Sequence, residues 1–282
     1  MRQVAIVGVG LIGGSFALAI RKAGYTGRIV GVSSPATVQE ALRLGVIDEG
    51  LPISKALPES DLVYLAQPIR RIIEDLSSLD PWLAPGALVT DAGSTKGEIV
   101  GRARAAVTRA QFLGGHPMAG KESRGVAAAE ADLFRGRTYI LTPSAPSELE
   151  TPAAVAFRQW IERIGSRVLI LSPKEHDRVV AFTSHLPQLL STTLAATLAE
   201  RLTDEGYLLA GGPGLLDCTR LAMSSFEIWD DILSTNGAAI DSALAAFVER
   251  LQELRRELVS DETRRSFEAG AALAARLRNG KR

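Results

Sequence analysis

The chain is poor in several residue types that define common classes of protein. A single cysteine, Cys218, among 282 residues excludes an internal disulfide and a cysteine-rich metal site. Lysine plus arginine and aspartate plus glutamate number 32 each, so no basic surplus is available to bind a nucleic-acid backbone. No apolar run approaches the roughly 20 residues that a membrane-spanning helix needs. We therefore expect a protein that holds no metal and binds neither nucleic acid nor membrane.

The start of the chain and its cysteine content bear on localisation. The first predicted strand begins at about residue 3, which leaves no room for a signal peptide before it. One unpaired cysteine fits a reducing compartment. We expect a cytoplasmic protein.

Only three histidines occur in the chain: His116, His176 and His185. Histidine is the common proton acceptor in catalysis because its unperturbed pKa lies near neutral pH. His116 lies in a glycine-rich stretch, residues 114–120, downstream of a candidate dinucleotide-binding turn. A hydride acceptor and a tunable base on one chain indicate oxidation of an alcohol carbon. The alternative for His116 is a structural histidine with satisfied hydrogen bonds.

The first 172 residues alternate short apolar runs with helical segments. Strands are expected at residues 3–9, 28–32, 61–67, 87–91, 111–114, 138–141 and 167–171. Ser172, Pro173 and Glu175 then form a capping box with proline at the first helical position, and only helical patterns follow. This order predicts an α/β Rossmann-type N-terminal domain with a mostly parallel sheet, followed by an all-α C-terminal dimerisation domain. We expect the dinucleotide-binding domain at 1–172 and the helical substrate and dimerisation domain at 173–282.

Three glycines follow the first strand at the spacing of a dinucleotide-binding turn. Gly8 allows a tight turn, Gly10 lets a pyrophosphate approach the backbone, and Gly13 lets the helix pack on the strand. The helix N-terminus then offers free N–H groups to the phosphates. The alternative is a glycine-rich turn that binds nothing. The candidate cofactor-binding residues are Gly8, Gly10, Leu11, Ile12, Gly13, Ser33, Ser34, Gln67 and Pro68.

The end of the second strand departs from the usual pattern. An acidic residue commonly holds the ribose 2′-hydroxyl there, whereas this chain has Ser33 and Ser34. Two hydroxyls would not repel a 2′-phosphate, so the cofactor is expected to be NAD or NADP.

The helical half contains a proline and a polar stripe. Pro187 lies inside a helical pattern and should kink or break it. His185, Gln188 and Thr192 recur at helical spacing on an otherwise apolar segment, which fits either a site-facing stripe or a solvated face. His176 lies nine residues before His185, half a turn out of phase on a straight helix, so the two are not expected to share a site.

Apolar residues also recur at alternating steps of four and three from residue 240. They are Ile240, Leu244, Phe247, Leu251, Leu254 and Leu258. This seam fits another helix, either in the same subunit or in a second copy. Long apolar helices are hard to bury in a domain of only ~100 residues, so we expect a homodimer through this half.

Six short motifs occur in order over nearly the whole chain. Three are Val7-Gly8-Val9-Gly10-Leu11-Ile12-Gly13-Gly14-Ser15, Asp91-Ala92-Gly93-Ser94-Thr95-Lys96 and Gly114-Gly115-His116-Pro117-Met118-Ala119-Gly120. The others are Ser184-His185-Leu186-Pro187, Asp217-Cys218-Thr219-Arg220 and Trp229-Asp230-Asp231-Ile232. Together and in this order they resemble the prephenate/arogenate dehydrogenase family of tyrosine biosynthesis.

The resemblance implies oxidative decarboxylation of a small cyclohexadienol, prephenate or arogenate. It implies that His116 is the catalytic base, that Ser94 contacts the ring hydroxyl and orients His116, and that Arg220 binds a substrate carboxylate. Ser94 could instead cap a helix, and Arg220 could instead pair with Asp217. His185 and Gln188 are further candidate substrate-binding residues. Gln188 stands where the family often has a second histidine.

Two other classes of protein remain open at this point. A β-hydroxyacid dehydrogenase has the same two-domain plan and would use a lysine such as Lys174. A non-catalytic NAD-binding sensor would leave His116, Ser94 and Arg220 without a shared task.

Overall fold

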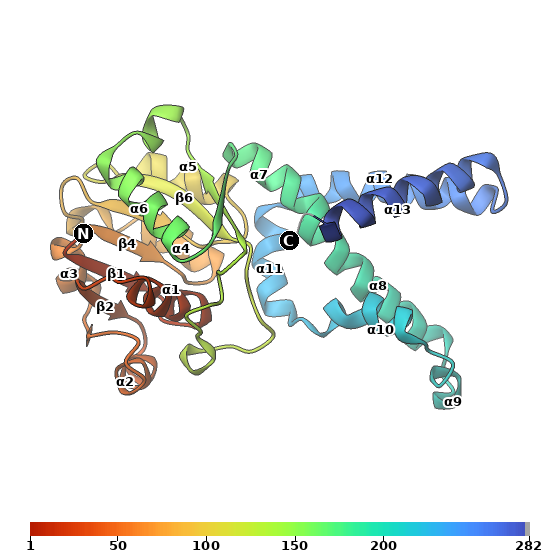
Figure 1. The fold of residues 1–282 in the computed structure, drawn as a ribbon, viewed down its shortest axis with the longest axis horizontal. Coiled ribbons are helices and arrows are strands. Elements are labelled where there is room, and N and C mark those ends of the chain that lie inside the picture. The colour runs from red at the N-terminus through yellow and green to blue at the C-terminus, as the bar shows by residue number, and fades with distance from the viewer. Residues whose placement is uncertain (280–282) are drawn as a thin grey trace. The chain divides into compact units, whose positions relative to one another are not determined.

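The computed structural model describes residues 1–279, apart from the side chain of Glu205. Its first part is one sheet of strand order β3-β2-β1-β4-β5-β6-β7-β8 (Figure 1). The strands are β1 (Gln3–Val7), β2 (Arg28–Val32), β3 (Glu49–Gly50), β4 (Leu62–Leu65), β5 (Leu88–Asp91), β6 (Gln111–Pro117), β7 (Thr138–Thr142) and β8 (Arg167–Ile170). Neighbouring strands are parallel except for β6 and β7. The mostly parallel sheet of the Rossmann type is thus confirmed.

Burial explains why the apolar runs formed this sheet. Every residue of β1, β4 and β5 is buried, as expected for parallel strands covered on both faces. Phe16 of α1 stacks on Tyr64 of β4 with ring centroids 4.0 Å apart. The helices of this part are α1 (Leu11–Lys22), α2 (Pro35–Arg43), α3 (Ile53–Ala56), α4 (Ile69–Leu76), α5 (Gly97–Ala106) and α6 (Pro152–Arg163).

Strand β6 is longer than the sequence predicted, and this places His116 in a strand. Residues Gly114 to Pro117 pair with Thr142 to Tyr139 of the antiparallel strand β7, and His116 stands opposite Ile140. The glycine-rich stretch has the composition of a turn, but the pairing satisfies its backbone polar groups and keeps it extended. His116 is therefore held on a rigid element.

After β8 the described chain is helical. The helices are α7 (Pro173–Val180), α8 (Leu186–Arg201), α9 (Glu205–Leu208), α10 (Pro213–Thr219), α11 (Phe226–Thr235), α12 (Gly237–Arg256) and α13 (Asp261–Asn279). The capping box at Ser172 and Glu175 is present. The predicted interruption at Pro187 is confirmed: residues Ala181–His185 form a π-helical segment, and Pro187 lies in the first turn of α8. Pro213 begins α10, where a missing N–H costs nothing.

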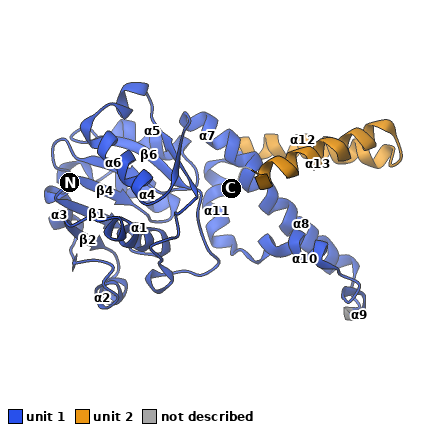
Figure 2. Ribbon diagram, in the orientation of Figure 1, with its two compact units in different colours: residues 1–237 blue, residues 238–282 orange. Residues whose placement is uncertain are grey.

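The chain separates into two compact units, residues 1–237 and 238–282 (Figure 2). The sheet and helices α7 to α11 all belong to the first unit. The domain boundary predicted at residue 172 therefore stays a prediction. It coincides with the change from strands to helices.

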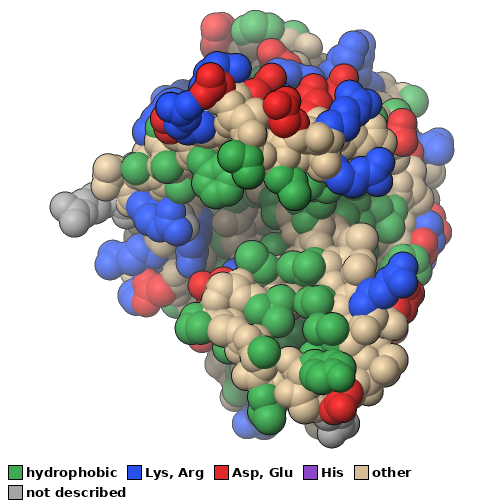
Figure 3. Space-filling view, turned by 90° about the vertical axis from the view of Figure 1, so that its right-hand side faces the viewer, with side chains coloured by type: hydrophobic (Ala, Val, Ile, Leu, Met, Phe, Trp, Pro, Cys, Tyr) green, Lys and Arg blue, Asp and Glu red, His purple; other side chains and the backbone are tan. Residues whose placement is uncertain are grey.

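The second unit contains most of α12 and all of α13. The predicted apolar seam is shortened, because α12 ends at Arg256 and Leu258 lies beyond it, 68% exposed. Leu251, Leu254 and Phe267 are also exposed. Figure 3 shows hydrophobic side chains gathered on the surface of the helical part of the molecule. Within residues 1–279, no helix has the length and apolar character that a membrane crossing requires.

Candidate functional site

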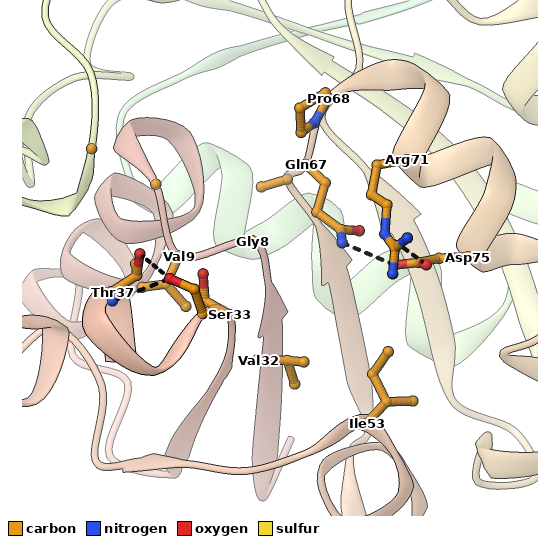
Figure 4. A pocket seen from close by; sticks show the side chains of 14 residues that line it. Gly8, Val9, Val32, Ser33, Thr37, Ile53, Gln67, Pro68, Arg71 and Asp75 are labelled. Carbon is orange, nitrogen blue, oxygen red and sulfur yellow. Dashed lines mark hydrogen bonds and ion pairs between the residues drawn. The ribbon is translucent and has the colours of Figure 1, made fainter. Parts of the chain in front are cut away.

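The turn between β1 and α1 borders a cavity of about 480 Å³ (Figure 4). Six of the predicted cofactor-binding residues line this cavity: Gly8, Gly10, Ser33, Ser34, Gln67 and Pro68. Leu11 and Ile12 line an adjacent cavity of about 430 Å³, together with Gln67, Pro68 and Ser94. The structure therefore places eight of the nine predicted residues around two neighbouring cavities.

The glycines of this turn differ in what surrounds them. Gly8 has φ +94, and a Cβ there would lie 2.8 Å from backbone atoms of Ala66. A Cβ on Gly13, the ninth predicted residue, would lie 2.1 Å from the Gly8 carbonyl oxygen. A Cβ on Gly10 would meet nothing within 4 Å. Gly8 and Gly13 thus let the strand and helix pack, whereas Gly10 keeps open space beside the cavity.

The residues around this cavity fit a dinucleotide. Gly10 gives α1 no side-chain cap and the first turn holds no acidic residue, so its N–H groups are available to a pyrophosphate. The Gln67 amide donates to Asp75 at 2.9 Å, while its Oε1 atom is buried without a partner and could accept from a hydroxyl. Ser33 and Ser34 place no carboxylate at the end of β2.

A second cluster lies where β6, α5 and α7 meet. His116 is 7% exposed and His176 is fully buried. Nδ1 of His116 lies 2.8 Å from Nε2 of His176, and Nδ1 of His176 lies 2.8 Å from Oδ1 of Asp177. We call His116, His176 and Asp177 the histidine relay.

Asp177 also caps α5. Its Oδ1 atom accepts from the Lys96 N–H and its Oδ2 atom from the Gly97 N–H, both at 2.7 Å. The alternative that Ser94 caps this helix is therefore wrong, because α5 begins at Gly97 and a carboxylate from α7 fills that role. Ser94 is left on the wall of the second cavity.

A buried ion pair lies beside the histidine relay. Lys96 and Asp91 are fully buried and pair with each other. The Lys96 ammonium also donates to the Gly115 carbonyl at 2.8 Å, and Asp91 accepts from the N–H groups of Gly93 and Gly115. Burial lowers the pKa of Lys96, and Asp91 opposes that shift. The pair thus places two charged groups next to His116, and the ammonium and the carboxylate both have hydrogen-bond partners.

The surroundings keep His116 neutral. Burial lowers its pKa well below 6.5, and the nearby His176, Lys96 and His185 lower it further. Burial also lowers the pKa of His176, although Asp177 acts in the opposite direction. A neutral imidazole is the form that accepts a proton.

His185 belongs to the same buried cluster. Its Nδ1 atom lies 3.3 Å from the Asn236 amide, which donates to the Asp177 carbonyl at 2.9 Å, and its ring packs edge-on against Trp229. Burial lowers the pKa of His185 to about 4. The prediction that His176 and His185 do not share a site is wrong, because the π-helical segment between them changes the phase expected of a straight helix.

Arg220 and Gln188 line a third cavity, of about 510 Å³. Arg220 is exposed and lies 3.9 Å from Glu122, so the alternative pairing with Asp217 is wrong. Gln188 is buried and donates to the Leu221 carbonyl at 2.7 Å, whereas Thr192 is exposed, so the predicted stripe is only partly solvated. This cavity shares Lys121 and Arg124 with the Ser94 cavity. His116 and His185 line neither of them.

Several contacts join α4 and the loop before α5 to α11. The guanidinium of Arg70 donates to Asp230 at 2.7 Å and to Ser234 at 3.1 Å, and the Thr95 and Thr235 hydroxyls are 2.7 Å apart. No sequence pattern indicated a role for Lys96, His176 or Asp177. Asp177 lies 81 residues from Lys96, and His176 lies 60 residues from His116, so no local spacing could reveal those two contacts. The pairing of Lys96 with Asp91 lies within a single motif. The scarcity of histidine was the one available signal.

This strand order, the glycine turn that opens α1 and the buried histidine that contacts α7 are the features expected of a nucleotide-dependent dehydrogenase. The chain belongs to the prephenate dehydrogenase family: the model of the family's nucleotide-binding domain matches residues 16–176, and that of its dimerization domain matches residues 172–270.

Named relatives agree with this assignment. The chain is 34% identical over 259 residues to prephenate dehydrogenase of Lactococcus lactis, covering 90% of this chain and 70% of that protein. The crystal structure of Aquifex aeolicus prephenate dehydrogenase with hydroxyphenyl propionate and NAD+ is 35% identical, with a TM-score of 0.83 over 100% of this chain and 96% of that one. Synechocystis arogenate dehydrogenase is 28% identical, with a TM-score of 0.78 over 99% of this chain and 98% of that one.

Two glycine variants separate packing from nucleotide binding. Gly13→Ala should lower the free energy of unfolding by at least about 1–3 kcal/mol, because its methyl group meets backbone. Gly10→Ala should leave stability nearly unchanged, because its methyl group meets no atom within 4 Å, and it should weaken NAD+ binding if the pyrophosphate lies against this turn. Thermal unfolding and NAD+ titration of both variants test this. Unchanged NAD+ affinity in a folded Gly10→Ala variant would contradict the placement of the cofactor.

The pH dependence of kcat/KM reports the pKa of the proton-accepting group in the free enzyme. If His116 is the proton-accepting group, its lowered pKa keeps it neutral as the pH falls through 6.5, and activity should be lost only at lower pH. Initial rates between pH 4.5 and 9 test this, with protein stability checked at each value. An acid limb centred above 6.5 would show that His116 does not have the environment described.

Proposed function

We propose that the chain catalyses the NAD(P)-dependent oxidative decarboxylation of prephenate, or of arogenate, to 4-hydroxyphenylpyruvate or tyrosine. The observation that carries this proposal is the buried imidazole of His116, whose pKa is lowered by burial and which is held at the end of β6 in a chain of the prephenate dehydrogenase family. Formation of the aromatic ring drives the reaction, so the protein mainly has to orient the substrate and accept a proton.

In the proposed reaction, His116 has one task. It accepts the ring hydroxyl proton while the hydroxyl-bearing carbon loses hydride and becomes a carbonyl carbon. The bond to the ring carboxylate then breaks, its electron pair enters the ring, and carbon dioxide leaves. His116 returns the proton to the new phenolate oxygen. A bound nicotinamide supplies the hydride-accepting carbon.

Substrate binding is proposed for the third cavity and its neighbour. Arg220, Lys121 and Arg124 line the third cavity, and each pairs there with an exposed carboxylate: Glu122, Glu130 and Glu227 respectively. A bound dicarboxylate would replace these exposed partners. An arginine can grip a carboxylate through two parallel hydrogen bonds and stays charged. Ser94, on the neighbouring cavity, is proposed to contact the ring hydroxyl. Gln188 is proposed to face the substrate side chain, and the buried His185 to support that wall.

The nucleotide-binding fold and the NAD+-bound Aquifex relative support NAD as the cofactor. NADP is also compatible, because Ser33 and Ser34 would not repel a 2′-phosphate. The dimerization-domain match and the exposed apolar residues of α12 and α13 support a homodimer through the C-terminal helices.

The two competing classes have less support. A β-hydroxyacid dehydrogenase would need a lysine base, but Lys174 is exposed in the first turn of α7. A non-catalytic sensor would leave the buried imidazole of His116 without a task.

Turnover of four pairs, prephenate and arogenate each with NAD+ and NADP+, tests the proposal. We expect one nicotinamide reduced and one carbon dioxide released per cyclohexadienol consumed. 3-Hydroxyisobutyrate serves as the control substrate of the competing dehydrogenase class. Oxidation of that hydroxy acid alone, or no turnover by folded protein that binds the nucleotide, would overturn the proposed function.

A further inference from the structure

We propose that His176 and Asp177 are positioning residues that hold His116 with its proton on Nδ1, so that Nε2 is the atom that accepts the substrate proton. The tautomer of the His116 ring is thus assigned to its neighbours. The importance of this tautomer for catalysis rests on the proposed function, whereas the positions of the protons can be measured without any substrate.

The direction of each hydrogen bond follows from Asp177. An ionised carboxylate only accepts hydrogen bonds, so Nδ1 of His176 carries a proton and donates it to Oδ1. A neutral His176 then has its lone pair on Nε2. That atom lies 2.8 Å from Nδ1 of His116 and must accept from it. Nδ1 of His116 is therefore protonated, and its lone pair lies on Nε2.

The carboxylate that starts this chain of hydrogen bonds is itself fixed. Two backbone N–H groups at the start of α5 donate to it, and Asn236 donates to the backbone carbonyl of the same residue. Rotation of the Asp177 side chain would leave those two N–H groups without their partner. Asp177, which is held by the start of α5, thus fixes the orientation of the His176 ring. The His176 ring in turn fixes that of His116.

Burial makes the alternatives unfavourable. His176 is fully buried, so water cannot replace either of its partners. If His176 carried a second proton, both of its ring nitrogens would donate. His116 would then have to accept at Nδ1 and carry its own proton on Nε2. Its Nε2 atom could no longer accept a proton from the substrate. Desolvation disfavours this charged form of His176.

No second group in the described structure performs the same task. Within residues 1–279, no hydrogen bond joins Ser94 to His116, although the family resemblance implied that Ser94 orients it. The hydrogen bond with His176 is thus the contact that orients the His116 ring. A wrong tautomer of a catalytic histidine typically costs up to about 10⁴-fold in kcat.

The tautomers are directly measurable because the chain has only three histidines. Long-range ¹H–¹⁵N correlation spectra of the ¹⁵N-labelled full chain, recorded near pH 7.5, distinguish protonated from unprotonated ring nitrogens. His116→Ala and His185→Gln spectra assign the signals. We expect the unprotonated nitrogen of His116 to be Nε2 and that of His176 also to be Nε2. An unprotonated Nδ1 in His116 would overturn the proposal.

A matched pair of variants tests the catalytic consequence. His176→Phe keeps a flat ring but cannot accept from His116, so kcat should fall at least about 10-fold while KM for substrate and nucleotide changes less than about twofold. His176→Gln can accept from His116 through Oε1 and donate to Asp177 through Nε2, so it should recover most of the lost kcat. Equal kcat in the two folded variants, or an unchanged kcat in His176→Phe, would refute the positioning role.

The two proposals fail in different ways. If the spectra show the expected tautomers but neither cyclohexadienol is turned over, the proposed function fails and the relay stands as a property of the fold. If turnover occurs but His116 carries its proton on Nε2, the proposed function stands and the relay is refuted.

Discussion

The carboxylate of Asp177 is the interaction on which the rest of the site depends. It lies on the first helix after the sheet, yet it caps α5 and accepts from His176, so one side chain joins the nucleotide-binding part to the helices. An N-cap is typically worth about 1 kcal/mol, and a buried N–H left without a partner costs about 1–3 kcal/mol. The role proposed for His116 and the packing of α5 against α7 thus both depend on the Asp177 carboxylate.

The charges around this carboxylate are arranged to keep the imidazoles neutral. Lys96 is paired with Asp91 and tied to the carbonyl of Gly115, the residue before His116. Desolvation is the largest influence on the pKa of His116, His176 and His185, and in each it favours the uncharged form. An imidazole buried this way stays able to accept a proton over a wide pH range, but it binds that proton more weakly.

Much of the fold could be predicted because local patterns determine it. The apolar runs around Val4 and Val63, the glycines of the first turn and the capping box at Ser172 each carry their own signal over a few residues. The pairing that extends β6 through His116 could not be predicted, because glycine and proline there have the composition of a turn. The two-residue strand β3 is too short to show any alternation.

The candidate site was predictable only in part. The nucleotide turn and the importance of His116 follow from a motif and from the scarcity of histidine. The capping of α5 by Asp177, rather than by Ser94, depends on how two segments about 80 residues apart pack against each other. The phase relation of His176 to His185 depends on a π-helical segment that a straight-helix count does not describe.

A double-mutant cycle on kcat/KM between His116 and His176 tests the central claim most directly. If His176 acts only through His116, His176→Phe lowers the rate at least about 10-fold in the wild-type background and leaves the residual rate of His116→Ala unchanged within about twofold. An equal fold loss in both backgrounds would contradict the account, because it would mean that His176 contributes independently of the base it is said to hold.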